Sequence, residues 1–177
     1  MLNTKTARML AHYKAWAGKV MFDGVAALPP GEAEKERKTL FKTMIGTLNH
    51  IYVVDLIWQA HLEQRDHGFK ARNVLVHPEF ATLWAAQRKV NDWIIDWAKA
   101  QSDASLEEEV AFTFVNGNKA TMTRGEMFLH LVTHGSYHLG WVAEMFFEAS
   151  ARPPQPDLSV FLCEGLCEAP QEWRSAV

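Results

Sequence analysis

Residues 123–150 read TRGEMFLHLVTHGSYHLGWVAEMFFEAS and begin with a helix-start signal. Thr123 and Glu126 form a T-x-x-E capping box, the pattern typical of the first turn of a helix. The positions that follow recur at intervals of four and three residues, the spacing of a helix face buried in a bundle. That face comprises Met127, Leu131, His134, His138, Trp141 and Met145. The stretch therefore predicts a long helix with two histidines in its core-facing seam.

Three further segments carry helical patterns. Residues 2–28 and 79–100 repeat apolar side chains at helical spacing, and residues 39–63 are densely apolar and free of proline. Proline-containing, charged or glycine-containing segments separate the three. Four long helices with one apolar face each predict an all-α protein, a four-helix bundle that forms a single domain over residues 1–177.

The helical period is interrupted at residues 109–123. This segment, EVAFTFVNGNKATMT, alternates β-branched and aromatic residues around Asn116-Gly117, a strong signal for a turn between two strands. We expect a small β-hairpin between the third and fourth helices. Prolines at 153, 154 and 156 end the fourth helix, so the rest of the chain to Val177 is expected to be short and irregular.

Composition excludes several classes of protein. The 177 residues are 48% hydrophobic, enough for one compact core, and 18 Lys and Arg against 21 Asp and Glu give a formal charge of −3. No basic surface for nucleic acid is expected from that balance. No apolar run approaches the roughly 18–20 residues that cross a bilayer, and two cysteines, Cys163 and Cys167, are too few for a secreted disulfide framework. We expect a cytoplasmic protein that binds neither nucleic acid nor a membrane.

The histidines of the fourth helix predict a metal site. His134 and His138 lie one turn apart on one face, so their imidazoles can converge on a single ion. His130 is four residues from His134 but eight from His138, about 12 Å along the axis, so all three cannot bind the same metal. A buried imidazole without a partner costs roughly 1–3 kcal/mol, which a shared ion would avoid. The alternative is a pair of core histidines that bond to Thr133 or Ser136.

Two ligands are too few for a stable site, and His50 is the candidate for a third. It belongs to a series with core spacing and small or polar members: Thr43, Thr47, His50, Val54 and Ile57. The alternative is a structural histidine bonded to Asn49 or to a backbone carbonyl. Three neutral imidazoles suit one divalent transition metal ion, such as Zn²⁺, Ni²⁺ or Fe²⁺, and leave at least one coordination position open.

Other side chains are candidates for orienting a ligand or a metal-bound water. These are His130, Tyr137, Tyr52 and Asp55. The alternative for each is packing at the bundle boundary. The sequence identifies no catalytic residue, and only His130 and Tyr137 are candidate general bases. The remaining histidines are expected on the surface or in loops: His12, His61, His67 and His77.

The motifs of other metal and hydrolytic enzymes are absent from the sequence. No histidine follows a glutamate by three residues, which disfavours a ferritin-like di-iron site. No histidine is followed by glutamate, which excludes the HExxH zinc proteases, and there is no G-x-S-x-G nucleophile elbow.

Several segments together carry a family resemblance. They are TLNHIYVVDLIW (47–58), FTFVNGNKATMT (112–123), FLHLVTHGSYHLGWV (128–142) and ARPPQPDLSVFL (151–162). In this order and spacing the chain resembles the DinB/YfiT-like superfamily of candidate metalloenzymes. The resemblance implies a four-helix bundle, often dimeric, with a divalent metal held by His50, His134 and His138.

The superfamily also suggests activities. Its characterised members include thiol-dependent transferases and a mycothiol-dependent isomerase, and many members are known as damage- or stress-inducible proteins. The resemblance implies a metal-dependent thiol transferase or hydrolase for a small molecule, with a low-molecular-weight thiol as co-substrate. The alternative is a non-catalytic homodimeric metal-binding protein of the stress or damage response. This chain has Leu139 and Trp141 where many members have Arg and Gln, so the substrate does not carry over.

Overall fold

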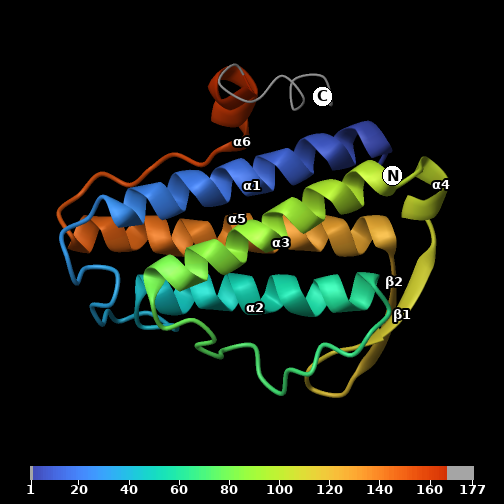
Figure 1. Cartoon of the computed structure of the whole chain (residues 1–177), viewed down its shortest axis with the longest axis horizontal. Helices are drawn as coiled ribbons and strands as arrows, with labels where there is room; N and C mark the ends of the chain where they lie inside the picture. The colour runs from blue at the N-terminus through green and yellow to red at the C-terminus, as the bar shows by residue number, and fades with distance from the viewer. Residues whose placement is uncertain (1, 167–177) are drawn as a thin grey trace.

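The computed structural model describes residues 2–166. Over this range the chain forms four long helices: α1 (Thr4–Ala26), α2 (Met44–Leu62), α3 (Phe80–Ala100) and α5 (Arg124–Glu148). α1 packs chiefly against α3 and α5, and α2 packs chiefly against α5. In Figure 1, α1 and α5 run in one direction and α2 and α3 in the opposite one. The predicted all-α, four-helix fold is confirmed.

The connection between α2 and α3 is long because the two helices run in the same direction. Residues 63–79 return along the bundle beside α2 before α3 begins (Figure 1). Asn49 of α2 ties down the end of this loop, since its side chain donates to the His77 carbonyl at 2.8 Å and accepts from the His77 N–H at 2.9 Å. Long loops in compact domains are often functional, and this one lies beside the helix that carries His50.

The predicted hairpin is confirmed between α3 and α5. A short helix, α4 (Asp103–Leu106), precedes β1 (Glu109–Thr113), which pairs antiparallel with β2 (Lys119–Thr123). Val110 and Phe112 point inward and are buried, as the alternating pattern requires. The connection spans residues 114–118, and Gly117 takes the left-handed conformation (φ 88°) that favours glycine.

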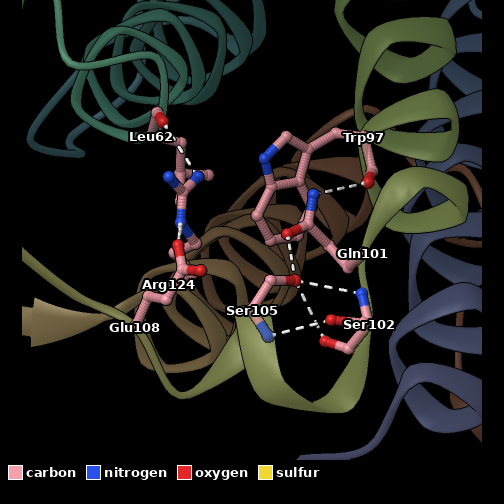
Figure 2. Close-up of polar contacts among 7 residues, drawn as sticks. All are labelled: Leu62, Trp97, Gln101, Ser102, Ser105, Glu108 and Arg124. Carbon is pink, nitrogen blue, oxygen red and sulfur yellow. Dashed lines mark hydrogen bonds and ion pairs between the residues drawn. The ribbon is translucent and has the colours of Figure 1, made fainter.

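Polar contacts hold the end of α2 to the start of α5 (Figure 2). Arg124, the first residue of α5, donates from Nε to Glu108 Oε2 at 3.0 Å and from Nη1 to the Leu62 carbonyl at 3.4 Å. Beside them, Ser102 and Ser105 cap α4 reciprocally, each hydroxyl accepting from the backbone N–H of the other. The two helices that carry the predicted ligands are therefore joined at this end of the bundle.

The two helices that carry the predicted ligands begin differently. α5 starts as predicted, because Thr123 accepts from the Glu126 N–H and the Glu126 carboxylate accepts from the Thr123 N–H. α2 starts at Met44, later than the predicted residue 39, because Thr43 caps it by accepting from the Gly46 N–H at 2.8 Å. The preceding residues form a turn that packs directly against this first helical turn.

The prediction of an irregular chain after α5 is wrong for residues 158–165. A short helix, α6 (Leu158–Val160), and a π-helical turn, η1 (Phe161–Gly165), pack over α1. The reason is Phe161, which is fully buried with ring centroids 5.8 Å from Tyr13 and 5.5 Å from Trp16. Cys163 is exposed, and Cys167 lies outside the described residues. Among the described helices, none is long and apolar enough to span a membrane.

Candidate metal centre

The packing of α2 against α5 brings three histidines together. His50 of α2 and His134 and His138 of α5 each place one ring nitrogen within 4.8 Å of those of the other two. The Nε2 atoms of His50 and His134 are 3.2 Å apart. Two nitrogens that bind one tetrahedral ion at about 2.0–2.1 Å lie roughly 3.3–3.4 Å apart, so the spacing of this pair fits a shared metal.

A backbone contact fixes which nitrogen of His50 is free to bind a metal. His50 Nδ1 lies 3.2 Å from the carbonyl oxygen of Arg72, in the α2–α3 loop. A carbonyl can only accept a hydrogen bond, so Nδ1 carries the proton and Nε2 presents its lone pair toward His134. Such an outer contact on the far nitrogen is typical of metal-binding histidines.

The alternative in which His134 and His138 bond to Thr133 or Ser136 is not what α5 shows. The Nδ1 atoms of His134 and His138 are buried, and within residues 2–166 neither has a hydrogen-bond partner. Thr133 donates its hydroxyl to the Leu129 carbonyl and Ser136 donates its hydroxyl to the Val132 carbonyl, so both are engaged in their own helix. His134 instead meets His50 of α2 through Nε2, so the nitrogen that faces the triad has no partner in its own helix and is available to an ion.

Electrostatics keep the triad neutral. Burial lowers the pKa of His134 to about 2, with further lowering from the charges that His138 and His50 would carry. Burial also lowers the pKa of His138 to about 4, helped by His50, and burial is the main cause that lowers the pKa of His50. The three rings are therefore neutral at neutral pH, each with one nitrogen lone pair free, which is the form that binds metal ions.

Aromatic side chains cover one side of the triad. Phe41, in the turn before α2, stacks on His50 with ring centroids 4.3 Å apart and meets His138 edge-on at 5.5 Å. Trp141 and Tyr137 pack against His138 with centroids 4.8 and 5.0 Å away. Sequence reasoning missed Phe41, because the prediction placed it inside a helix over residues 39–63 and outside the core series of His50, whereas it lies in the turn before Met44.

The four predicted supporting residues divide into two pairs. His130 adjoins His134 with ring centroids 5.4 Å apart, and Tyr137, although 62% exposed, lies against His138. Tyr52 instead packs its ring against His77, in the α2–α3 loop. Asp55 points into the core, so its effect on the triad is limited to its charge, which raises the pKa of His50.

Asp55 belongs to a buried polar network. Its Oδ2 atom accepts from Lys14 Nζ at 2.8 Å and from Gln87 Nε2 at 2.9 Å. Lys14 in turn lies against Gly135, where an added Cβ would be 3.2 Å from Nζ. This network therefore links α1, α2 and α3 behind the helix turn that carries His134.

An open cavity adjoins the triad at His134, and Phe41 is not among its lining residues. It measures about 470 Å³, and its walls include His134 itself, together with His130, Trp58 and residues 70–73 of the α2–α3 loop. The cavity has the size of a small-molecule pocket and reaches one of the three candidate ligands directly.

Two histidines predicted at the surface are buried. His12 is 1% and His61 is 7% exposed, and burial lowers the pKa of each to about 4. His61 lies against the rings of Trp58 and Phe112, because the hairpin covers the end of α2. His67 and His77 do lie in the α2–α3 loop, where both are half-buried.

Comparison with known proteins agrees with this architecture. The DinB family model matches residues 1–165. Protein DinB from Bacillus subtilis (strain 168) is 22% identical to the chain over 165 residues, which cover 86% of this chain and 91% of that protein. With this fold, this triad and a match over nearly the whole chain, the protein belongs to the DinB family.

Proposed function

We propose that the protein is a metal-dependent enzyme that binds one divalent transition metal ion, such as Zn²⁺, Ni²⁺ or Fe²⁺, through His50, His134 and His138. The convergence of three neutral ring nitrogens within 4.8 Å, next to an open cavity, is the observation that carries this proposal. Three protein ligands are the number found in catalytic sites, whereas structural ions are closed by four.

The chemistry proposed is thiol transfer or hydrolysis. When bound, the metal would supply a Lewis acid that lowers the pKa of a thiol or water at its open position. In thiol transfer, the sulfur forms a bond to an electrophilic carbon while that carbon's bond to its leaving group breaks. The sulfur's proton and the leaving group are then released. In hydrolysis, water takes the place of the thiol.

The chain's own residues would position and deprotonate the nucleophile. His50 is oriented by the Arg72 carbonyl, and the rings of Phe41 and Trp141 would shield His50 and His138 from water where they pack against them. His130 lines the cavity beside His134 and is placed to accept the proton of a thiol or water there. Tyr137 is a second candidate for this role, on the outer side of His138.

Activity can be tested with two model reactions. Zinc-loaded protein is assayed for transfer of cysteine to 1-chloro-2,4-dinitrobenzene, which releases chloride, and for hydrolysis of p-nitrophenyl acetate. We expect acceleration of at least one reaction over buffer, lost in metal-free protein, restored by Zn²⁺, and absent from His134→Ala. Equal rates with and without metal would contradict the proposal.

A second candidate function is a homodimeric metal-binding protein without turnover, acting in a stress response. Apolar side chains exposed on α5 favour a dimer: Leu129, Tyr137 and Phe147. The cavity beside His134 favours the enzyme, because a structural ion needs no access. Light scattering after size exclusion decides the oligomeric state, since the dimer predicts twice the 20.1 kDa chain mass and a monomer contradicts it.

A further inference from the structure

We propose that the cavity beside His134 binds a small organic anion, a carboxylate or phosphate joined to a planar apolar group. Lys70 and Arg72 would hold the anionic end and Trp58 the planar end. This inference rests on the proposed function, because it names the substrate class of the same site.

The charges around the cavity favour an anion. Lys70 and Arg72 both line it, and its lining contains no aspartate or glutamate. Neither cation takes part in any of the ion pairs found among residues 2–166. Neutral imidazole ligands would also leave the charge of a bound divalent ion uncompensated. A carboxylate or phosphate would balance these positive charges and bind the Arg72 guanidinium through two hydrogen bonds.

Arg72 is held close to the triad by its own backbone. Its carbonyl oxygen accepts from His50 Nδ1, so the residue is anchored one hydrogen bond from the candidate metal ligands. Asn49 holds the far end of the same loop through two hydrogen bonds with His77. The backbone that carries this cation is thereby anchored beside the cavity.

The other wall of the cavity is aromatic. Trp58 is buried, and its ring packs against His130, with centroids 4.5 Å apart, and against Phe112, with centroids 5.2 Å apart. Phe114 meets it edge-on at 6.4 Å and also lines the cavity. A lining that combines aromatic rings with two cations suits a ligand with one planar apolar end and one charged end.

The test compares probes of one shape and different charge. Binding of 2-naphthoate, 2-naphthyl phosphate and the neutral 2-naphthamide is measured by NMR shifts of the Trp58 indole N–H, on zinc-loaded and on metal-free protein. We expect at least one anion to bind about tenfold or more tightly than the amide in both states. The stronger of the two anions shows whether the site prefers carboxylate or phosphate.

Matched charge variants complete the test. Lys70→Gln/Arg72→Gln should weaken the preferred anion about tenfold or more, while Lys89→Gln/Arg152→Gln, which removes two exposed cations outside the cavity lining, should not. Anion binding that needs zinc but ignores Lys70 and Arg72, or no preference over the amide, would overturn the inference even if zinc binds stoichiometrically. If the protein takes up no metal but binds the anion with the expected preference over the amide and the expected dependence on Lys70 and Arg72, this inference is supported and the proposed metal site is contradicted.

Discussion

His50 and His134 are 84 positions apart in the sequence, and their Nε2 atoms lie 3.2 Å apart across the contact between α2 and α5. Neither helix can form this pair alone, so the candidate metal centre depends on how the two helices are packed and on what fixes each ring. Two features support the rings: the aromatic turn before α2 and the buried polar network behind α5. Separate mutations can test each of them.

The turn that carries Phe41 is predicted to control metal affinity. An added Cβ at Gly46 would lie 2.3 Å from the Phe41 carbonyl oxygen, so Gly46→Ala must displace the turn and the ring that stacks on His50. We expect zinc affinity to fall roughly tenfold or more, as for other disturbed outer contacts of metal ligands. Competition titration against a chromophoric chelator measures it.

Gly140→Ala is the matched control for this change. Gly140 lies on α5 near His138, is exposed, and has nothing within 4 Å of an added Cβ. This variant should keep its zinc affinity and gain about 0.5–1 kcal/mol of stability from better helix propensity. Similar zinc affinity in the two variants would show that the Phe41 turn does not support the site.

The buried pair of Lys14 and Asp55 is predicted to be a large contribution to stability. Lys14→Met leaves the Asp55 carboxylate buried without its cation, which should cost about 3–5 kcal/mol in urea unfolding. Lys19→Met, which removes an exposed partner of Asp23, should cost at most about 1 kcal/mol. The double variant Lys14→Met/Asp55→Leu should recover much of the loss. Equal losses in the two single variants would contradict this interpretation.

Stability is predicted to fall in mild acid partly through His12. Burial lowers the pKa of His12 to about 4, below the 6.5 of an unfolded histidine, so the unfolded chain binds the extra proton first. The contribution of His12 to the free energy of unfolding is complete above pH 6.5. It is lost as the pH falls toward 4, by up to about 1.4 kcal/mol per pH unit. Urea unfolding of metal-free His12→Gln should show a correspondingly flatter pH dependence than the wild type. If the stabilities of the wild type and of His12→Gln changed with pH in parallel, this contribution of His12 would be ruled out.

The fold could be predicted from local sequence patterns that have a direct physical cause. The capping box at Thr123 and Glu126 predicted the start of α5, and the alternation in residues 109–123 predicted the hairpin. The core spacing of the histidines also predicted their convergence, since it places His134 and His138 on the face that meets α2. The capping box and the hairpin depend on neighbours close in the sequence, whereas the convergence of the histidines also needs the packing of α2 against α5.

The surroundings of the triad depend on tertiary contacts that leave no local pattern. Arg72 reaches His50 only because the α2–α3 loop runs back beside α2, and a loop sequence does not reveal its path. The burial of His61 likewise depends on where the hairpin folds over α2. Asp55 was placed correctly on a buried helix, but its partner Lys14 comes from a helix that the sequence could not align with it.

The three-histidine site itself is best tested by metal content. Protein prepared without a polyhistidine tag is saturated with Zn²⁺, desalted and analysed for metal, with His134→Ala and the same-helix control His130→Ala beside it. We predict about one equivalent of metal in the wild type and in His130→Ala and little in His134→Ala, because His130 lies outside the triad. A wild type that retains no metal, or a His134→Ala variant that retains a full equivalent, would contradict the assignment of His50, His134 and His138 as the ligands.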